Sequence, residues 1–230
     1  MTIFRYALIK GLRNPLTLVC NCILPLVIVF INPLWTGEGF LTGYGLLVLV
    51  IWAGSYLMTQ GTLRDKETGA ITRILAAPIS MRNYLTQNLL AFMVPLTVQL
   101  VLVSVIGSVL YDWSLIFAFG LFLILAAFTV ASVTMSFAWN CLFKEKENNF
   151  TSFSALLTFG AMLSGAFMPL EFLPDALQNV GAVFPAFWAM RAVSSLSDIA
   201  TMGTDYWVSI AALALFSIAF LLYGGKRRMI

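Results

Sequence analysis

Apolar residues dominate six stretches of the chain, and short polar segments separate them. The stretches cover residues 17–35, 41–60, 89–110, 115–141, 151–167 and 207–224. Each approaches or exceeds the roughly 20 residues that a helix needs to cross the hydrocarbon core of a bilayer. The pattern predicts an all-α integral membrane protein, with six transmembrane helices in one domain over residues 1–230.

Residues 1–14 carry a different pattern, in which cationic and apolar side chains fall on opposite sides of a helix. The cations are Arg5, Lys10 and Arg13, and the apolar residues are Phe4, Ala7, Leu8 and Leu12. This arrangement predicts an amphipathic helix in the cytoplasmic interface, with its cations near anionic lipid. The alternative is a frayed, solvated terminus.

Residues 168–206 are half apolar and contain Pro169, Pro174 and Pro185. The segment is too interrupted for a span and too apolar for a free loop. It predicts short re-entrant helices before the last span, because irregular backbone at membrane depth is tolerated where protein buries it.

Basic residues fall on one side of this topology. Twelve of the 13 Lys and Arg residues lie before span one, between spans two and three, between spans four and five, or after span six, and only Arg191 lies opposite. Cytoplasmic loops carry such an excess of Lys and Arg, so both termini are predicted to be cytoplasmic. Trp35, Trp113 and Trp207 are then expected at the outer interface.

Composition and motifs limit the classes of function that the chain could have. The chain is 60% hydrophobic and 10% charged, and it has no histidine. No Asp, Glu, Lys or Arg lies inside a predicted span, which disfavours proton-coupled carriers, because these keep ionisable groups at depth. The sequence also lacks a GxxxxGK[ST] phosphate loop and any Ser/His or Cys/His pair. We therefore expect no enzyme activity, no metal site and no nucleotide site in this chain.

The most charged segment, Arg64–Tyr84, lies between spans two and three and holds six of the 23 charges. Ile71, Ile74 and Leu75 share one face at helical spacing, and Pro78 would end that helix. On the residues alone, a short amphipathic helix and a solvated, incidentally helical loop are equally good interpretations.

This segment resembles the loop between spans two and three of ABC-2 type transporter permeases. The matching positions are Glu67, Gly69, Leu75, Pro78, Ile79, Ser80 and Tyr84, while Ala70 stands where threonine is common. A second resemblance, to the family's outer re-entrant segment, is carried by Ser164, Gly165, Pro169, Leu173, Pro174, Pro185 and Arg191. Both motifs occupy the family's topological positions.

The resemblance implies the permease subunit of an ABC exporter in the bacterial cytoplasmic membrane. A second permease subunit, identical or paralogous, would complete the path, and separate ABC ATPase subunits would bind ATP and Mg, so this chain would need no cofactor and no nucleic acid. The coupling helix would contact the ATPase through Glu67, Gly69, Ile71, Arg73, Ile74, Leu75 and Pro78. Lys144 and Glu145, in a loop over residues 144–149, would form a smaller second contact.

The resemblance also places spans two and five at the centre of the path. Trp52, Ser55 and Thr59 lie near one face of span two, and Ser154 and Thr158 lie on span five. Small and hydroxyl residues fit helix packing as well as cargo contact. An uncharged path suits an amphipathic or hydrophobic cargo, such as a drug, an antibiotic, a lipopeptide or a modified peptide. The alternatives are a stand-alone channel or secondary carrier, and a non-transporting membrane scaffold.

Overall fold

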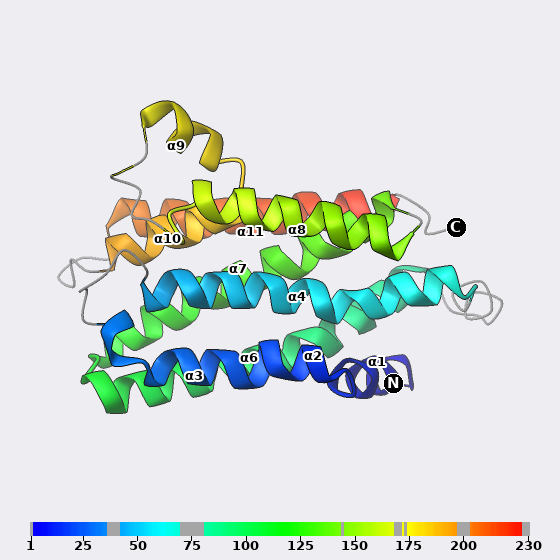
Figure 1. Ribbon diagram of the computed structural model, residues 1–230, viewed down its shortest axis with the longest axis horizontal. Helices are drawn as coiled ribbons and strands as arrows, with labels where there is room; N and C mark the ends of the chain where they lie inside the picture. The colour runs from blue at the N-terminus through cyan, green and yellow to red at the C-terminus, as the bar shows by residue number, and fades with distance from the viewer. Residues whose placement is uncertain are drawn as a thin grey trace.

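The computed structural model describes residues 2–35, 42–69, 81–143, 145–167, 172, 174–196 and 203–226. Within these ranges the chain forms helices and no strand, which confirms the all-α class. The long helices lie side by side in one bundle (Figure 1). In chain order the helices are α1 (Thr2–Leu12), α2 (Pro15–Leu18), α3 (Leu24–Phe30), α4 (Gly43–Glu67), α6 (Met81–Tyr111), α7 (Leu115–Leu142), α8 (Lys146–Leu163), α9 (Asp175–Gly181), α10 (Pro185–Ser195) and α11 (Thr204–Lys226).

Four of these helices contain a segment long and apolar enough to cross a membrane. The segments are Gly43–Glu67, Thr86–Tyr111, Leu115–Leu142 and Thr204–Gly224. A bent pair, Ile3–Leu12 with Pro15–Phe30, brings the number in the described residues to five if the pair is counted as one span. The chain is thus a multi-pass membrane protein. Six spans, cytoplasmic termini and re-entrant helices stay predictions.

The first predicted span is not one regular helix. Its described part consists of α2, a π-helical turn over Val19–Ile23, α3 and a 3-10 turn over Asn32–Leu34. Asn14 caps α2 by accepting a hydrogen bond from the Leu16 N–H at 3.1 Å, and Pro15 occupies the first helical position. These residues separate α1 from α2, and the chain bends by 83° there.

Helix α1 packs on α6 with the face that the sequence marks as apolar. Ala7 is buried in a cluster with Tyr84, Ala91 and Phe92. Phe4 and Leu8, which are partly buried, pack against that cluster. A separate amphipathic helix at the N-terminus is therefore present, and its apolar face is covered at least in part by protein.

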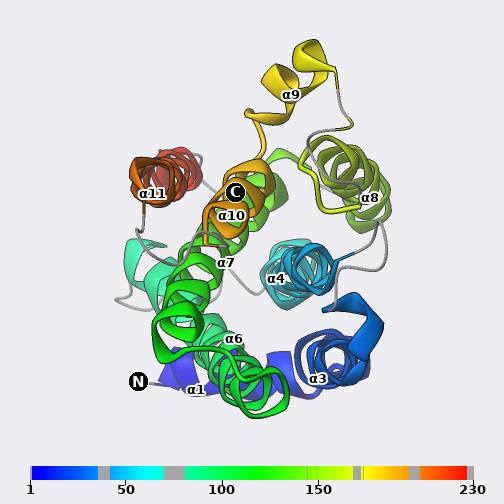
Figure 2. The ribbon, with the colours of Figure 1, turned by 90° about the vertical axis from the view of Figure 1, so that its left-hand side faces the viewer.

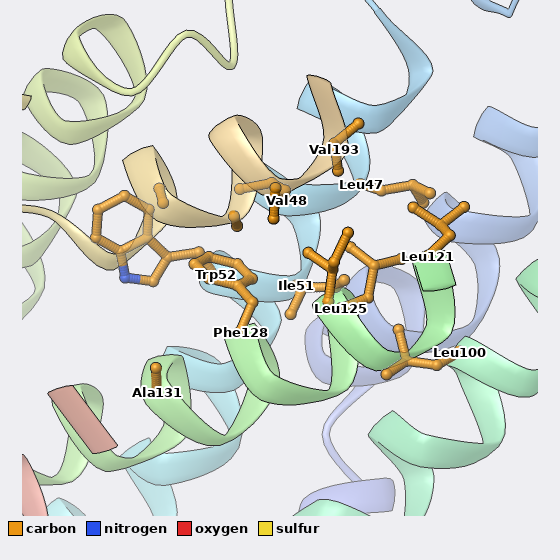
Figure 3. Packing of buried hydrophobic residues seen from close by; sticks show 14 of the residues in the cluster. Leu47, Val48, Ile51, Trp52, Leu100, Leu121, Leu125, Phe128, Ala131 and Val193 are labelled. Atoms are coloured by element: carbon orange, nitrogen blue, oxygen red, sulfur yellow. The ribbon is translucent and has the colours of Figure 1, made fainter. Parts of the chain in front are cut away.

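The bundle is centred on α7, which contacts α4, α6, α10 and α11 (Figure 2). Trp52 of α4 meets Phe128 of α7 edge to face, with 6.4 Å between ring centroids. Both side chains are at most 1% exposed, and Figure 3 shows them beside Ile51 and Leu125 in the main apolar cluster. The core thus joins helices that are far apart in sequence.

The segment before α11 forms two short helices, α9 and α10. Gly165 follows the end of α8 with φ of +82°, a conformation that suits glycine. Helix α10 packs against α11, α7 and α4 through small buried residues, Ala186, Ala189 and Ala192. Short helices were predicted here. The motif positions Pro169 and Leu173 lie outside the described residues.

Five rings gather where α4 begins. This aromatic cluster consists of Trp35, Tyr44, Tyr111, Trp113 and Phe117, in which contacting rings have centroids 4.9–6.4 Å apart. The Trp35 Nε1–H donates to the Ile28 carbonyl at 2.9 Å, and the Tyr111 hydroxyl donates to the Val29 carbonyl at 2.7 Å. The cluster fastens α3, α4, α6 and α7 together at one end of the bundle.

Candidate functional site: the coupling face

Three of the predicted ATPase contacts lie at the opposite end of α4 from the aromatic cluster. We define the coupling face as Asp65–Gly69, Phe143, Glu145 and Lys146, together with Lys10 and Tyr84. Of the predicted coupling residues, Glu67, Gly69 and Glu145 lie on this face. The other predicted coupling residues, Ile71, Arg73, Ile74, Leu75, Pro78 and Lys144, lie outside the described residues.

Glu67, the last residue of α4, caps α8. Its Oε1 accepts a hydrogen bond from the Lys146 backbone N–H at 2.8 Å. Lys146 is the first residue of α8, and the N-cap residue Glu145 makes no side-chain capping bond. The first N–H groups of a helix have no partner within the helix, and the positive end of the helix dipole favours a carboxylate there. The start of the predicted coupling segment is therefore bonded directly to the start of α8.

Lys66 makes a second connection from α4. Its Nζ donates to the Phe143 carbonyl at 3.3 Å, and Phe143 is the C-cap residue of α7. A cation is favourable at the carbonyl end of a helix. Lys66 and Glu67 together join α4 to both sides of the α7–α8 junction.

Gly69 ends this part of the chain with φ of +68°, in the left-handed region. Its N–H donates to the Lys66 carbonyl at 3.1 Å. A glycine in this conformation is a common helix terminator, because a side chain would make the conformation strained. Gly69 is therefore suited to end α4 at this point.

Asp65 joins three helices at the coupling face. One carboxylate oxygen pairs with the Lys10 ammonium of α1, and the other accepts a hydrogen bond from the Tyr84 hydroxyl of α6 at 3.2 Å. Burial, and then the neighbouring Asp65 charge, raise the pKa of the Tyr84 phenol. The phenol therefore stays protonated and continues to donate to Asp65.

A buried amide network lies just beneath the coupling face and was not predicted from the sequence. The Tyr56 hydroxyl donates to Asn149 Oδ1 at 2.6 Å, and Gln60 Nε2 donates to the same oxygen at 3.4 Å. Asn140 Nδ2 donates to the Thr59 carbonyl at 3.1 Å. Asn140 and Asn149 are at most 1% exposed, and the network ties α4 to α7 and α8. The sequence feature that could have indicated this network is the presence of amide side chains at the ends of the apolar stretches.

The predicted loop over residues 144–149 needs correction. Lys146 and the residues after it form the first turn of α8, so this helix begins before the expected position 151 and ends at Leu163. Asn149 is buried and cannot form part of an exposed loop. Glu145 is exposed, and its Oε2 accepts a hydrogen bond from Asn148 Nδ2 at 2.6 Å.

The residues predicted to line the path separate into two groups. Trp52, Ser55 and Thr59 are at most 1% exposed and lie inside the chain's own core. Ser154 is half-buried and Thr158 is exposed, and their hydroxyls donate to carbonyls of α8 itself at 2.8 and 2.9 Å. Within one copy of the chain, the structure does not bring these groups to a shared surface.

Comparison with known proteins identifies the family. No curated protein matches the chain. The sequence profile described as "ABC-2 family transporter protein" matches residues 36–225, most of the chain. The match includes α4, every residue of the coupling face except Lys10, and most of α11. The match confirms the predicted resemblance and marks the chain as a component of membrane transport. This chain belongs to the ABC-2 family of transporter proteins.

Proposed function

We propose that the chain is the permease subunit of an ATP-driven ABC exporter, and that work enters it through the coupling face. Separate ATPase subunits bind ATP and Mg and contact the segment that follows Gly69. A second permease subunit, identical or paralogous, completes the path. The observation that carries this proposal is the hydrogen bond from the Lys146 N–H to Glu67, because it joins the coupling segment to the start of α8.

The mechanism follows from these connections. ATP draws the two ATPase subunits together and moves the coupling segments, and Glu67 and Lys66 pass that movement to the α7–α8 junction. Helix α8 then moves relative to the rest of the bundle, and the two permease halves open toward the far side of the membrane. ATP hydrolysis and release of the products return the halves to their starting arrangement.

The cargo we propose is amphipathic or hydrophobic. Residues of α7, α8 and α11, with Val183 and Phe184, line a cavity of about 480 Å³, and the lining is mostly apolar. Trp139 contributes to the lining, and its Nε1–H has no hydrogen-bond partner among the described residues. Ligand pockets of this size combine apolar walls with a few polar groups that fix orientation. A drug, an antibiotic, a lipopeptide or a modified peptide has this chemistry.

The test measures ATP hydrolysis by the complex with its cognate ABC ATPase in proteoliposomes. Glu67→Ala removes the cap of α8, and we expect cargo-stimulated hydrolysis to fall about fivefold, the factor that corresponds to a capping bond of about 1 kcal/mol. Glu67→Gln keeps a hydrogen-bond acceptor at this position, so its cargo-stimulated hydrolysis should fall less than that of Glu67→Ala. The exposed Glu147, in the same first turn of α8, supplies the control Glu147→Ala, which should keep normal stimulation.

The same assay examines the apolar face of the coupling segment. Ile74→Asp should abolish stimulation, because it would place a charge in the ATPase groove, while Ala70→Thr, which restores the residue common in the family, should not. Both variants are first checked for normal membrane insertion. Normal stimulation in Glu67→Ala and Ile74→Asp, or uphill transport by the purified chain without an ATPase, would overturn the proposal.

A further inference from the structure

A cavity of about 510 Å³ lies where α1 meets α4 and α6, beside the coupling face. Four cationic residues contribute to its lining, Lys10, Arg13, Arg64 and Lys146, and one acid, Asp65. Apolar side chains from α4 and α6, among them Leu57, Met58 and Phe92, line the remainder. The cavity therefore combines a strongly positive part with an apolar part.

The single carboxylate is already engaged. Asp65 pairs with Lys10 through one oxygen and accepts from Tyr84 through the other. Among the described residues, no carboxylate lies within ion-pair distance of Arg13, Arg64 or Lys146. Three cations around one cavity, none of which has an ion-pair partner among the described residues, mark a site for an anion.

A buried hydroxyl adds an independent observation. Thr17 lines the cavity and is only 2% exposed. Its Oγ1 has no hydrogen-bond partner among the described residues. Buried polar groups are normally hydrogen-bonded, so a ligand oxygen in the cavity is the natural acceptor for this hydroxyl.

The surroundings point to a lipid as the source of the anion. The cavity lies at the 83° bend between α1 and the segment that starts at Pro15. Exposed apolar side chains continue from this bend along the first predicted span, including Leu16, Val19 and Ile23. A headgroup phosphate in the cavity would therefore have an apolar surface next to it for an acyl chain.

We propose that this cavity binds the phosphate group of an anionic phospholipid from the adjacent leaflet. Arg13, Arg64 and Lys146 supply the charge, as in other basic pockets between membrane helices, and the Thr17 hydroxyl donates to a phosphate oxygen. The lipid joins the starts of α2 and α8 to the end of α4. The binding does not depend on the proposed export function.

The test uses the full chain purified in a neutral detergent, with lipid binding counted by native mass spectrometry and thermal unfolding measured in parallel. Phosphatidylglycerol should bind and raise the Tm by several degrees. Phosphatidylcholine, which has the same chains and no net charge, and inorganic phosphate should each give a small shift or none. An equal shift with phosphatidylcholine, or with millimolar inorganic phosphate, would overturn the assignment to an anionic lipid.

Substitutions locate the site. The double variant Arg13→Gln with Arg64→Gln should weaken phosphatidylglycerol binding about 25-fold, because each cation near a lipid surface contributes roughly a fivefold factor. Thr17→Val keeps the side-chain shape and should weaken binding three- to tenfold, an effect of the size expected for one hydrogen bond. Arg191→Gln, a cation paired with Asp205 on α11, is the control and should bind normally. Unchanged binding in Thr17→Val would overturn the proposal even if the double variant failed to fold.

Discussion

Single carboxylates join separate helices at the coupling face. Asp65 holds α1 and α6 against α4, and Glu67 caps α8 across 79 positions of sequence. The sequence predicted lipid contact for Lys10 and ATPase contact for Glu67, because the partners of a charge cannot be recognised without knowing which helix ends meet. Both residues have a partner within the chain in this structure. Lipid contact by Lys10 and ATPase contact by Glu67 remain predictions, and both must be compatible with these bonds within the chain.

At the residue scale, we predict that Asp65→Asn destabilises the protein. The change leaves the partly buried Lys10 ammonium without a charged partner, and it weakens the acceptor for Tyr84. The free energy of unfolding should therefore fall by about 1–2 kcal/mol. Thermal unfolding in detergent measures this as a lower Tm. The control is Asp205→Asn, in which the lost partner is Arg191, 3.1 Å away in an exposed pair. Exposed pairs contribute little, so equal losses in the two variants would contradict the prediction.

At the element scale, helix interiors and helix ends differ in how well the sequence specifies them. The apolar stretches predicted α4, α6, α7 and α11, because the bilayer requires continuous apolar helices. The predicted helix ends were less accurate, because capping bonds and contacts between helices determine where a helix ends. Helix α4 continues to Glu67, and α8 begins at Lys146, where Glu67 caps it.

The first predicted span also departs from a regular helix, at a place where it packs closely on α4. The π-helical turn over Val19–Ile23 was not expected within a continuous apolar stretch. Asn21 lies in this turn and is buried against α4, where a side chain at Gly54 would meet its Oδ1 at 2.0 Å. Such a close approach between two helices depends on tertiary packing, which the hydrophobic pattern of one helix does not contain.

Also at the element scale, we predict that Asn149→Leu loosens the junction of α4, α7 and α8. The substitution removes the acceptor of both Tyr56 and Gln60 in a buried site, which costs about 1–3 kcal/mol. Tyr56→Phe, which removes one hydroxyl, should cost about 1 kcal/mol. The Tm of each purified variant is measured by thermal unfolding. The control is Asn148→Leu, at the exposed neighbouring position. An Asn149→Leu protein as stable as the Asn148→Leu protein would show that the network is not stabilising.

At the scale of the whole molecule, the number of membrane crossings depends on α8. This helix has 18 residues and is not among the four helices that are long and apolar enough by themselves. The basic residues place Glu147 on the cytoplasmic side and Asn179 outside if α8 crosses the membrane. Both positions are exposed and lie on helices, so they form a matched pair of probes.

We predict that a membrane-impermeant maleimide labels Asn179→Cys in intact cells and labels Glu147→Cys only after permeabilisation. The experiment replaces the native Cys20, Cys22 and Cys141 by alanine, which leaves the introduced thiol as the reactive one. Labelling of both positions from outside, or of neither, would mean that α8 does not cross. In that case the six-span topology would be wrong, while family membership would be unaffected.

The two ends of α4 are fastened by different chemistry. At Gly43, a side chain would meet the Trp35 ring at 2.5 Å, and ring contacts hold the neighbouring helices there. At the other end, Lys66 donates to the Phe143 carbonyl and Glu67 accepts from the Lys146 N–H, and both of these bonds can be exchanged for bonds to water. A force applied at Glu67 should therefore displace that end most and the Gly43 end least. Helix α4 would then swing about a pivot at the aromatic cluster, as a lever does, rather than slide along its own axis.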